Sequence, residues 1–126
     1  MKTYFGIALT LLAGIGIGAA TVQGLHAQAK PSAYVITEVE IINPEAFKEF
    51  APKVAEVNRA AGGKYLARGG EIVALDGQPP KRVTLTVFES VEKAQAARTS
   101  AAWKELTPLR EKATKTRSYI VEGLTN

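Results

Sequence analysis

A charge-free apolar run near the amino terminus sets the limits within which the rest of the chain can fold. After a short positive start, the run FGIALTLLAGIGIGAATV, from Phe5 to Val22, contains no charged residue. It leads to Ala-Gln-Ala at 27–29, a small-x-small sequence of the kind that signal peptidase cleaves. We therefore predict that residues 1–29 are a signal peptide and that residues 30–126 fold as one periplasmic or secreted domain.

An uncleaved membrane anchor is the alternative interpretation of this run. Its length is at the lower edge of what spans a bilayer, and its glycines weaken it as a helix. Gly14 and Gly18 form a small-xxx-small pair, which could pack two membrane helices together. In either case we expect the globular part outside the cytoplasm, touching a membrane only through this segment.

The composition excludes several classes of site. The chain has no cysteine, and its one histidine, His26, belongs to the predicted leader. A mature chain would then lack a thiolate, an imidazole and the usual ligands of zinc, copper and haem iron, so we expect no metal and no cofactor. The 16 basic and 12 acidic side chains are interspersed, which indicates a solvated surface and no nucleic-acid partner. There is no phosphate loop, dinucleotide fingerprint or Ser/His/Asp set.

Hydrophobic residues switch between a period of two and a period near 3.6 along residues 30–126, which indicates alternating strands and helices. The predicted elements are strand Ala33–Ile41, a helix from Pro44 to Gly62 kinked at Pro52, strand Lys64–Leu75 interrupted at Gly69-Gly70, strand Arg82–Phe88, a helix after Ser90 broken near Ser100, and strand Arg117–Gly123. Two split β-α-β units in this order predict an α+β fold, with a four-stranded antiparallel sheet and both helices on one face.

The other face of this sheet is too apolar to lie in water. We predict that the helices cover Val35, Val39, Val83, Leu85 and Val87, which leaves Tyr34, Ile36, Thr84, Thr86 and Phe88 on the opposite face. An antiparallel sheet with one solvated face should alternate to clearly polar residues there. The pattern therefore predicts a homodimer in which two sheets pack face to face.

The middle of the chain resembles a known bacterial family. The stretch GGKYLARGGEIVALDG (Gly62 to Gly77), followed by RVTLTVFES and by IVEG (Ile120 to Gly123), is similar to domain of unknown function 1330. The similarity covers Ala33 to Leu124. It implies a ferredoxin-like fold of the dimeric α/β-barrel superfamily, which includes small monooxygenases and haem-degrading enzymes, although this family has no assigned activity.

The second helix departs from the pattern of these relatives, which often carry an aromatic residue near its centre and another just after a serine. Here the two places read Ala96-Ala97 and Ala101-Ala102-Trp103. Any ligand shared across the family is therefore in doubt for this chain.

The arginine between two diglycines is the main candidate for a binding residue. A glycine pair inside a strand marks a bulge or a close backbone approach, so we predict a bulge at Gly69-Gly70. Such a bulge would turn Arg68 towards a cleft between sheet and second helix, where its paired donors suit a carboxylate. The alternative is that the bulge only bends the sheet for barrel closure.

Three further residues are candidate ligand contacts. Tyr65 could supply a phenol to the cleft, and Trp103 could form its wall, although packing in the strand and in the core are the alternatives. Glu38 shares a strand face with Tyr34 and should pair with an arginine or shift its pKa upwards. Its partner among the arginines stays open between Arg68, Arg82 and Arg117, and exposure at the edge of the sheet is the alternative.

Two functions from different classes fit these features. The first is an exported dimer that binds a small apolar or acidic molecule in the cleft without transforming it. The second is a cofactor-free monooxygenase or isomerase, because a substrate with its own reactivity needs only positioning and desolvation. The lack of the usual catalytic side chains favours the first.

Overall fold

The structure is a computed structural model that describes residues 30–125. The predicted signal peptide and its alternative as an anchor lie outside the described residues, so both stay predictions. The elements are β1 (Ala33–Ile41), α2 (Pro44–Ala60), β2 (Lys64–Arg68), β3 (Val83–Phe88), α3 (Val91–Thr99), α4 (Ala101–Ala113) and β4 (Thr114–Glu122). Among residues 30–125, no helix has the length and apolarity needed to cross a bilayer.

The first helix begins and ends where the sequence predicts. The Asn43 side chain accepts a hydrogen bond from the Ala46 amide at 3.1 Å, and Pro44 follows at the first helical position. Gly62 follows the helix with φ of +92°, a conformation that glycine adopts at little cost. The helix continues through Pro52, which lies at its exposed surface.

The second helical region is two helices, as the predicted break near Ser100 requires. Ser90 caps α3 by accepting from the Lys93 amide at 3.2 Å. Ser100 is extended, with φ −67° and ψ 155°; its hydroxyl donates to the Ala97 carbonyl and accepts from the Trp103 amide. One serine thus ends α3 and caps α4.

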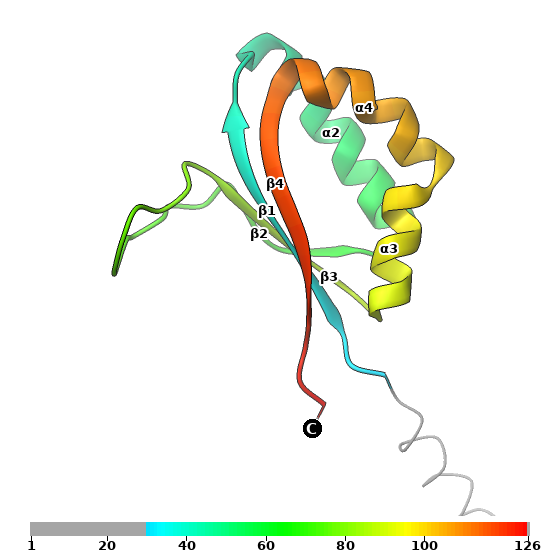
Figure 1. Cartoon of the computed structure of the whole chain (residues 1–126). Coiled ribbons are helices and arrows are strands. Elements are labelled where there is room, and N and C mark those ends of the chain that lie inside the picture. Colours follow the sequence, from blue (N-terminus) through cyan, green and yellow to red (C-terminus); the bar gives the residue numbers. More distant parts are fainter. Residues whose placement is uncertain (1–29, 126) are drawn as a thin grey trace, which may run out of the picture. The chain divides into compact units, whose positions relative to one another are not determined.

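The four strands form one antiparallel sheet in the order β2-β3-β1-β4. All three helices lie on the same face of this sheet (Figure 1). This is the ferredoxin-like α+β architecture that the family resemblance implies, and the prediction of the fold class is confirmed.

The strand register corrects the prediction of which β3 residues meet the helices. Thr86 pairs with Val35, and Thr84 pairs with Thr37. Because directly opposed residues share a face, Thr84, Thr86 and Phe88 belong to the inner face under the helices. Val83, Leu85 and Val87 belong instead to the outer face, so β3 was predicted the wrong way round. The prediction placed Val83, Leu85 and Val87 in the core because they are more hydrophobic than the threonines. The inner face instead carries Thr84 and Thr86, which line a cavity.

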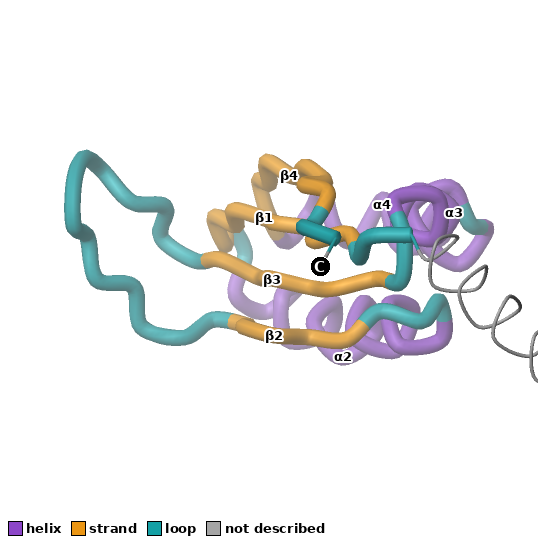
Figure 2. Tube along the Cα trace, turned by 90° about the horizontal axis from the view of Figure 1, so that it is seen from below, coloured by secondary structure: helices purple, strands orange, loops and turns teal. Residues whose placement is uncertain are grey.

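The second strand ends earlier than predicted. β2 stops at Arg68, and residues 69–82 form a long loop that extends beyond the sheet (Figure 2). The predicted continuation Glu71–Leu75 is wrong, because no described strand pairs with it, and Leu75 is 97% exposed. The irregularity in the ladder lies between Tyr65 and Ala67, not at Gly69-Gly70.

The buried core consists of two small groups of side chains under the helices. One joins Val35 and Phe88 to Ala94 of α3, and the other joins Phe50 of α2 to Ala113 of α4. Small residues on the helices let them approach the sheet closely. Both groups supply walls to the cavity described next.

Candidate functional site

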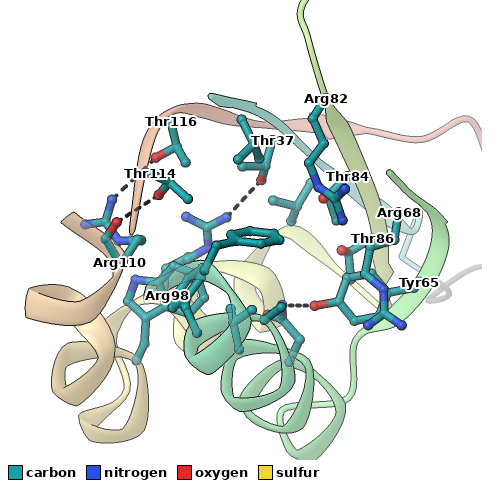
Figure 3. A pocket seen from close by; sticks show the side chains of 18 of the residues that line it. Thr37, Tyr65, Arg68, Arg82, Thr84, Thr86, Arg98, Arg110, Thr114 and Thr116 are labelled. Carbon is teal, nitrogen blue, oxygen red and sulfur yellow. Dashed lines mark hydrogen bonds between the residues drawn. The ribbon is translucent and has the colours of Figure 1, made fainter. Parts of the chain in front are cut away.

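A cavity of about 80 Å³ lies against the inner face of the sheet. Threonines of β1, β3 and β4 line it on the side of the sheet (Figure 3). Its apolar lining includes Phe47, Phe50 and Val54 of α2. Neither aspartate nor glutamate contributes to the lining. The polar side-chain groups of the cavity are therefore hydroxyls, one amide, the indole N–H of Trp103 and the guanidinium groups of four arginines.

The four arginines come from four different parts of the fold. They are Arg68 at the end of β2, Arg82 just before β3, Arg98 on α3 and Arg110 on α4. Among the described residues, none of the ion pairs involves any of them. Four positive side chains thus face one small cavity without a carboxylate to neutralise them.

Arg98 is half-buried and has the most polar contacts among these arginines that the described residues provide. Its Nη2 donates to Ser118 Oγ at 2.8 Å and to Thr37 Oγ1 at 3.3 Å, and its Cζ lies 4.2 Å from the centre of the Trp103 ring. Burial, and then the nearby charge of Arg110, lower the pKa of Arg98 below its ordinary value. Because Arg98 is partly withdrawn from water and lies near the positive charge of Arg110, an anion bound beside it would be stabilised.

Arg110 carries a buried donor with no partner. Its Nη1 donates to Thr116 Oγ1 at 3.4 Å, but its Nε is buried without a hydrogen bond to any described residue. Buried donors are nearly always satisfied in folded proteins. An orphaned Nε beside a cavity is therefore suited to a ligand oxygen.

Arg82 explains the first glycine after Arg68. A Cβ built on Gly69 would lie 2.5 Å from Arg82 Cζ, and Gly69 has φ of +69°. The Arg82 guanidinium lies 5.1 Å from the centre of the Phe47 ring. Glycine is thus favoured at position 69 by the backbone conformation, and its lack of a side chain also leaves room for the Arg82 guanidinium, whereas Gly70 has open space around it.

The bulge in β2 places Arg68 on the cavity side. Residues three apart in a regular strand face opposite ways, yet Tyr65 pairs with Thr86 and Arg68 with Thr84, both on the inner face. The extra residue, Leu66, produces this change of phase. A bulge does re-aim Arg68, although it lies before this residue and not at the glycines after it.

Tyr65 and Arg68 lie together at one side of the cavity (Figure 3). The Tyr65 hydroxyl accepts from Asn58 Nδ2 at 2.9 Å, and Arg68 Cζ lies 4.5 Å from the centre of the tyrosine ring. The structure thus brings Tyr65, Arg68 and Trp103 into one lining. Ligand binding by these residues remains a prediction.

Glu38 is not part of this cavity. It lies on the outer face, where Arg117 Nη2 donates to its Oε2 at 2.8 Å, Arg117 Nε donates at 3.2 Å and the Tyr119 hydroxyl donates at 2.9 Å. Arg117 is therefore its partner among the three arginines considered. Hydrogen bonds from Arg117 and then from Tyr119 lower the pKa of Glu38, so the upward shift expected without a partner does not occur.

Sequence reasoning missed Arg98 and Arg110. Both lie on helices, and in isolation a helical arginine predicts only a solvated surface. The available signal was the small buried residues next to them, Ala94 and Ala97 before Arg98 and Ala113 after Arg110. These mark the helix faces that approach the sheet.

Metal binding has no support in the part of the chain that the structure describes. Within residues 30–125 there is no group of three or more histidine, aspartate or glutamate side chains that could hold an ion. The described site is suited to anions instead.

Comparisons with known proteins agree on the architecture. Residues 32–124 match the family described as "Domain of unknown function (DUF1330)". The RPA0582 protein of unknown function from Rhodopseudomonas palustris has 16% identity and a TM-score of 0.61, with 84% of this chain and 94% of that chain covered. No curated protein matches the sequence.

One solved structure of similar fold has an activity in its description. SnoaB, a cofactor-independent oxygenase from Streptomyces nogalater, has a TM-score of 0.56 and 7% identity, with 76% of this chain and 96% of that chain covered. At these identities, the likeness to both solved structures concerns the fold alone.

Proposed function

This chain belongs to the DUF1330 family, and on that premise we propose that it binds a small organic acid in the arginine-lined cavity. The observation that carries the proposal is the set of four arginines around a cavity whose lining contains no acid. Arg82, Arg98 and Arg110 are half-buried, and Arg68 is exposed at the side of the cavity. Charges withdrawn from water cost free energy unless they are paired. A bound carboxylate would provide that pairing, and arginine offers it two parallel donors.

The apolar part of the lining supports a ligand with a hydrocarbon body. Phe47, Phe50 and Val54 form one wall, and Trp103 contributes from α4. Small-molecule sites are typically apolar with a few fixed polar groups that set orientation. In this proposal, the carboxylate meets the arginines, with Arg68 and Tyr65 at one side, while the body packs on the aromatic rings.

A homodimer through the outer face of the sheet is part of the same proposal. With the corrected register, the apolar residues of that face are Tyr34, Ile36, Val83, Leu85, Val87, Tyr119 and Val121. Tyr119 and Val121 are 41% and 46% exposed. Packing against a second copy would remove these side chains from water, as expected for this superfamily.

Export is also proposed, on the sequence of residues 1–29 alone. Cell fractionation and amino-terminal sequencing of the purified protein test it. A mature terminus at Lys30 in the periplasm or medium is the expected result. A full-length chain in the membrane fraction would favour the anchor, and a full-length chain in the cytoplasm would contradict export.

The binding proposal is tested with one acid and its neutral analogue. Purified protein is first analysed by native mass spectrometry for a co-purifying acid and is then titrated calorimetrically with pentanoate and with pentanamide. We expect pentanoate to bind and pentanamide, which lacks the charge, to bind at least about ten-fold more weakly, since a hydrogen bond to a charged group contributes about 1.5–3 kcal/mol. Equal affinity for both compounds, or no binding of pentanoate, would contradict the proposal.

Arg117→Gln is the matched control for this titration. Arg117 lies on the outer face and bonds Glu38, so its loss should leave binding of pentanoate unchanged. A weaker affinity in this variant would mean that the charge of the whole molecule, rather than the cavity, controls binding.

The second candidate function is a cofactor-free oxygenase or isomerase. It is favoured by the fold shared with SnoaB, together with a lining in which Tyr65 is the one phenol and no carboxylate occurs. Such an enzyme would depend on a substrate that brings its own reactivity. Oxygen uptake on addition of a reduced aromatic substrate such as a hydroquinone would support this function over simple binding.

A further inference from the structure

We infer that the ligand of this cavity carries two anionic groups joined by a short carbon chain, as in a dicarboxylate. The inference rests on the proposed function, since it names the class of acid that the same cavity binds. It follows from the way in which the four arginines divide into two pairs, anchored on different halves of the sheet.

The first pair, Arg98 and Arg110, is anchored on β1 and β4. Arg98 donates to Thr37 of β1 and Ser118 of β4, and Arg110 donates to Thr116 of β4. The hydroxyls are neutral, so they orient both guanidinium groups without neutralising them. On the Arg98 and Arg110 side of the cavity, the buried Nε of Arg110 is a hydrogen-bond donor without a partner among the described residues.

The second pair is Arg68, the last residue of β2, and Arg82, which directly precedes β3. Arg68 pairs in the ladder with Thr84, and the carbonyl of Arg82 accepts from the Val39 amide at 2.8 Å. Each guanidinium lies over an aromatic ring, Tyr65 for Arg68 and Phe47 for Arg82. An aromatic face attracts the cation but accepts none of its in-plane N–H groups, so these stay available to an anion.

The sheet order keeps the two pairs apart. Because the strands run β2-β3-β1-β4, the second pair lies on one half of the sheet and the first pair on the other. Figure 3 shows Arg98 and Arg110 on one side of the cavity and Arg68 and Arg82 on the other. Neighbouring strands are about 4.8 Å apart, so the anchors are roughly 5–15 Å from each other across the sheet.

One carboxylate carries a single negative charge, so it does not neutralise two pairs of guanidinium groups. A carboxylate accepts two parallel bonds from one guanidinium and would leave the opposite pair unneutralised. A second anionic group on the same ligand would meet that pair, and Thr37 and Thr84, which are directly opposed in the register, line the cavity on the side of the sheet between them. The small volume of about 80 Å³ favours a short connecting chain.

The test compares glutarate with pentanoate, two acids with the same number of carbons. Both are titrated calorimetrically into the wild-type protein, the single variants Arg68→Gln and Arg110→Gln, and the outer-face control Arg117→Gln. We expect the wild type and the control to bind glutarate at least about ten-fold more tightly than pentanoate, because one more charged hydrogen-bonding contact forms. Each cavity variant should reduce that preference to less than about three-fold.

The outcomes separate this inference from the function on which it rests. If pentanoate and glutarate bind the wild type equally, the two-anion inference is wrong, although acid binding stands. If neither acid binds, the proposed function fails as well. A melting curve of each variant checks its folding, and if Arg110→Gln does not fold, Arg110→Lys replaces it and should retain part of the preference. A folded Arg110→Gln protein that keeps the full preference would overturn the assignment of Arg110.

Discussion

The two faces of the sheet hold their arginines under opposite conditions. On the outer face, Arg117 makes two-pronged hydrogen bonds to Glu38, which also accepts from Tyr119. On the inner face, four arginines surround a cavity, and none has a carboxylate partner among the described residues. An arginine whose charge is already paired within the chain has a structural role, whereas unpaired arginines around a cavity are available to a ligand.

The ionisation of the two kinds of arginine differs accordingly. The hydrogen bond to Glu38 raises the pKa of Arg117, while burial and then the charge of Arg110 lower the pKa of Arg98. The Glu38 hydrogen bond likewise raises the pKa of Tyr119. On the outer face, the charges of Arg117 and Glu38 therefore stabilise each other. On the inner face, Arg98 has no carboxylate partner among the described residues.

Replacing Phe88 should have the largest effect on stability, because it removes the main side chain of the inner face. Phe88 is 4% exposed and packs with Val35 and Ala94. Phe88→Ala should lower the free energy of unfolding by about 3–5 kcal/mol, measured by urea denaturation. Val121→Ala on the outer face, where the side chain is 46% exposed, should cost less than about 1 kcal/mol in the monomer. Similar losses would contradict the distinction between the faces.

Replacing Leu85 with a charged residue should weaken the proposed homodimer. Leu85 pairs with Ile36 on the outer face, so Leu85→Glu would bury a charge against a second copy and cost several kcal/mol at that interface. Sedimentation equilibrium should show a dimer for the wild type and a folded monomer for this variant. Ala96→Glu, on the exposed surface of α3, is the control and should remain dimeric. A wild-type monomer at micromolar concentration would contradict the proposed dimer.

The two adjacent glycines should respond differently to alanine. Gly69 has positive φ and no room beside Arg82, so Gly69→Ala should lower stability by about 1–2 kcal/mol from the backbone alone. Gly70 has neither constraint, so Gly70→Ala should leave the melting temperature nearly unchanged. The melting curves of the two variants, recorded side by side, check this. Equal losses would contradict the need for glycine at position 69, whether for its positive φ or for the approach of Arg82.

The smallest expected effect concerns Glu38 and pH. Because its pKa is lowered in the folded chain, Glu38 stabilises the fold above its ordinary pKa of 4.5, and this contribution is lost as pH falls through the lowered value. Melting temperatures recorded from about pH 6 to pH 3 should therefore fall more steeply for the wild type than for Glu38→Gln. Parallel curves would mean that the ion pair with Arg117 adds nothing to stability.

The sequence predicted the order of the elements because caps and periodicity are local signals. Asn43, Ser90 and Ser100 act where their residue types suggest, and the helix predicted between Pro44 and Gly62 is confirmed. The orientation of β3 could not be read in this way. Its two sets of residues are both compatible with burial, and only the pairing of Thr86 with Val35 decides between them.

The site was predictable only where it lies close to an unusual local sequence. Arg68 drew attention because glycines follow it, and Gly69 proved to have positive φ and to lie against Arg82, a residue from the far end of the loop. Arg98 and Arg110 meet the cavity through long-range contacts with Ser118 and Thr116. Such contacts leave no periodic signal in the chain.

The extended conformation of Ser100 separates α3 from α4 and thereby sets the positions of Arg98 and Arg110 relative to each other. In an uninterrupted helix, Arg98 and Arg110 would be about 18 Å apart along the axis, at 1.5 Å per residue. Their hydrogen-bond partners Ser118 and Thr116 are instead two residues apart on one strand, about 7 Å. Moving the break by one residue would rotate Arg110 about its helix by roughly 100° relative to Arg98. Such a rotation would turn Arg110 away from Thr116, so the position of a single helix boundary decides whether this arginine faces the cavity.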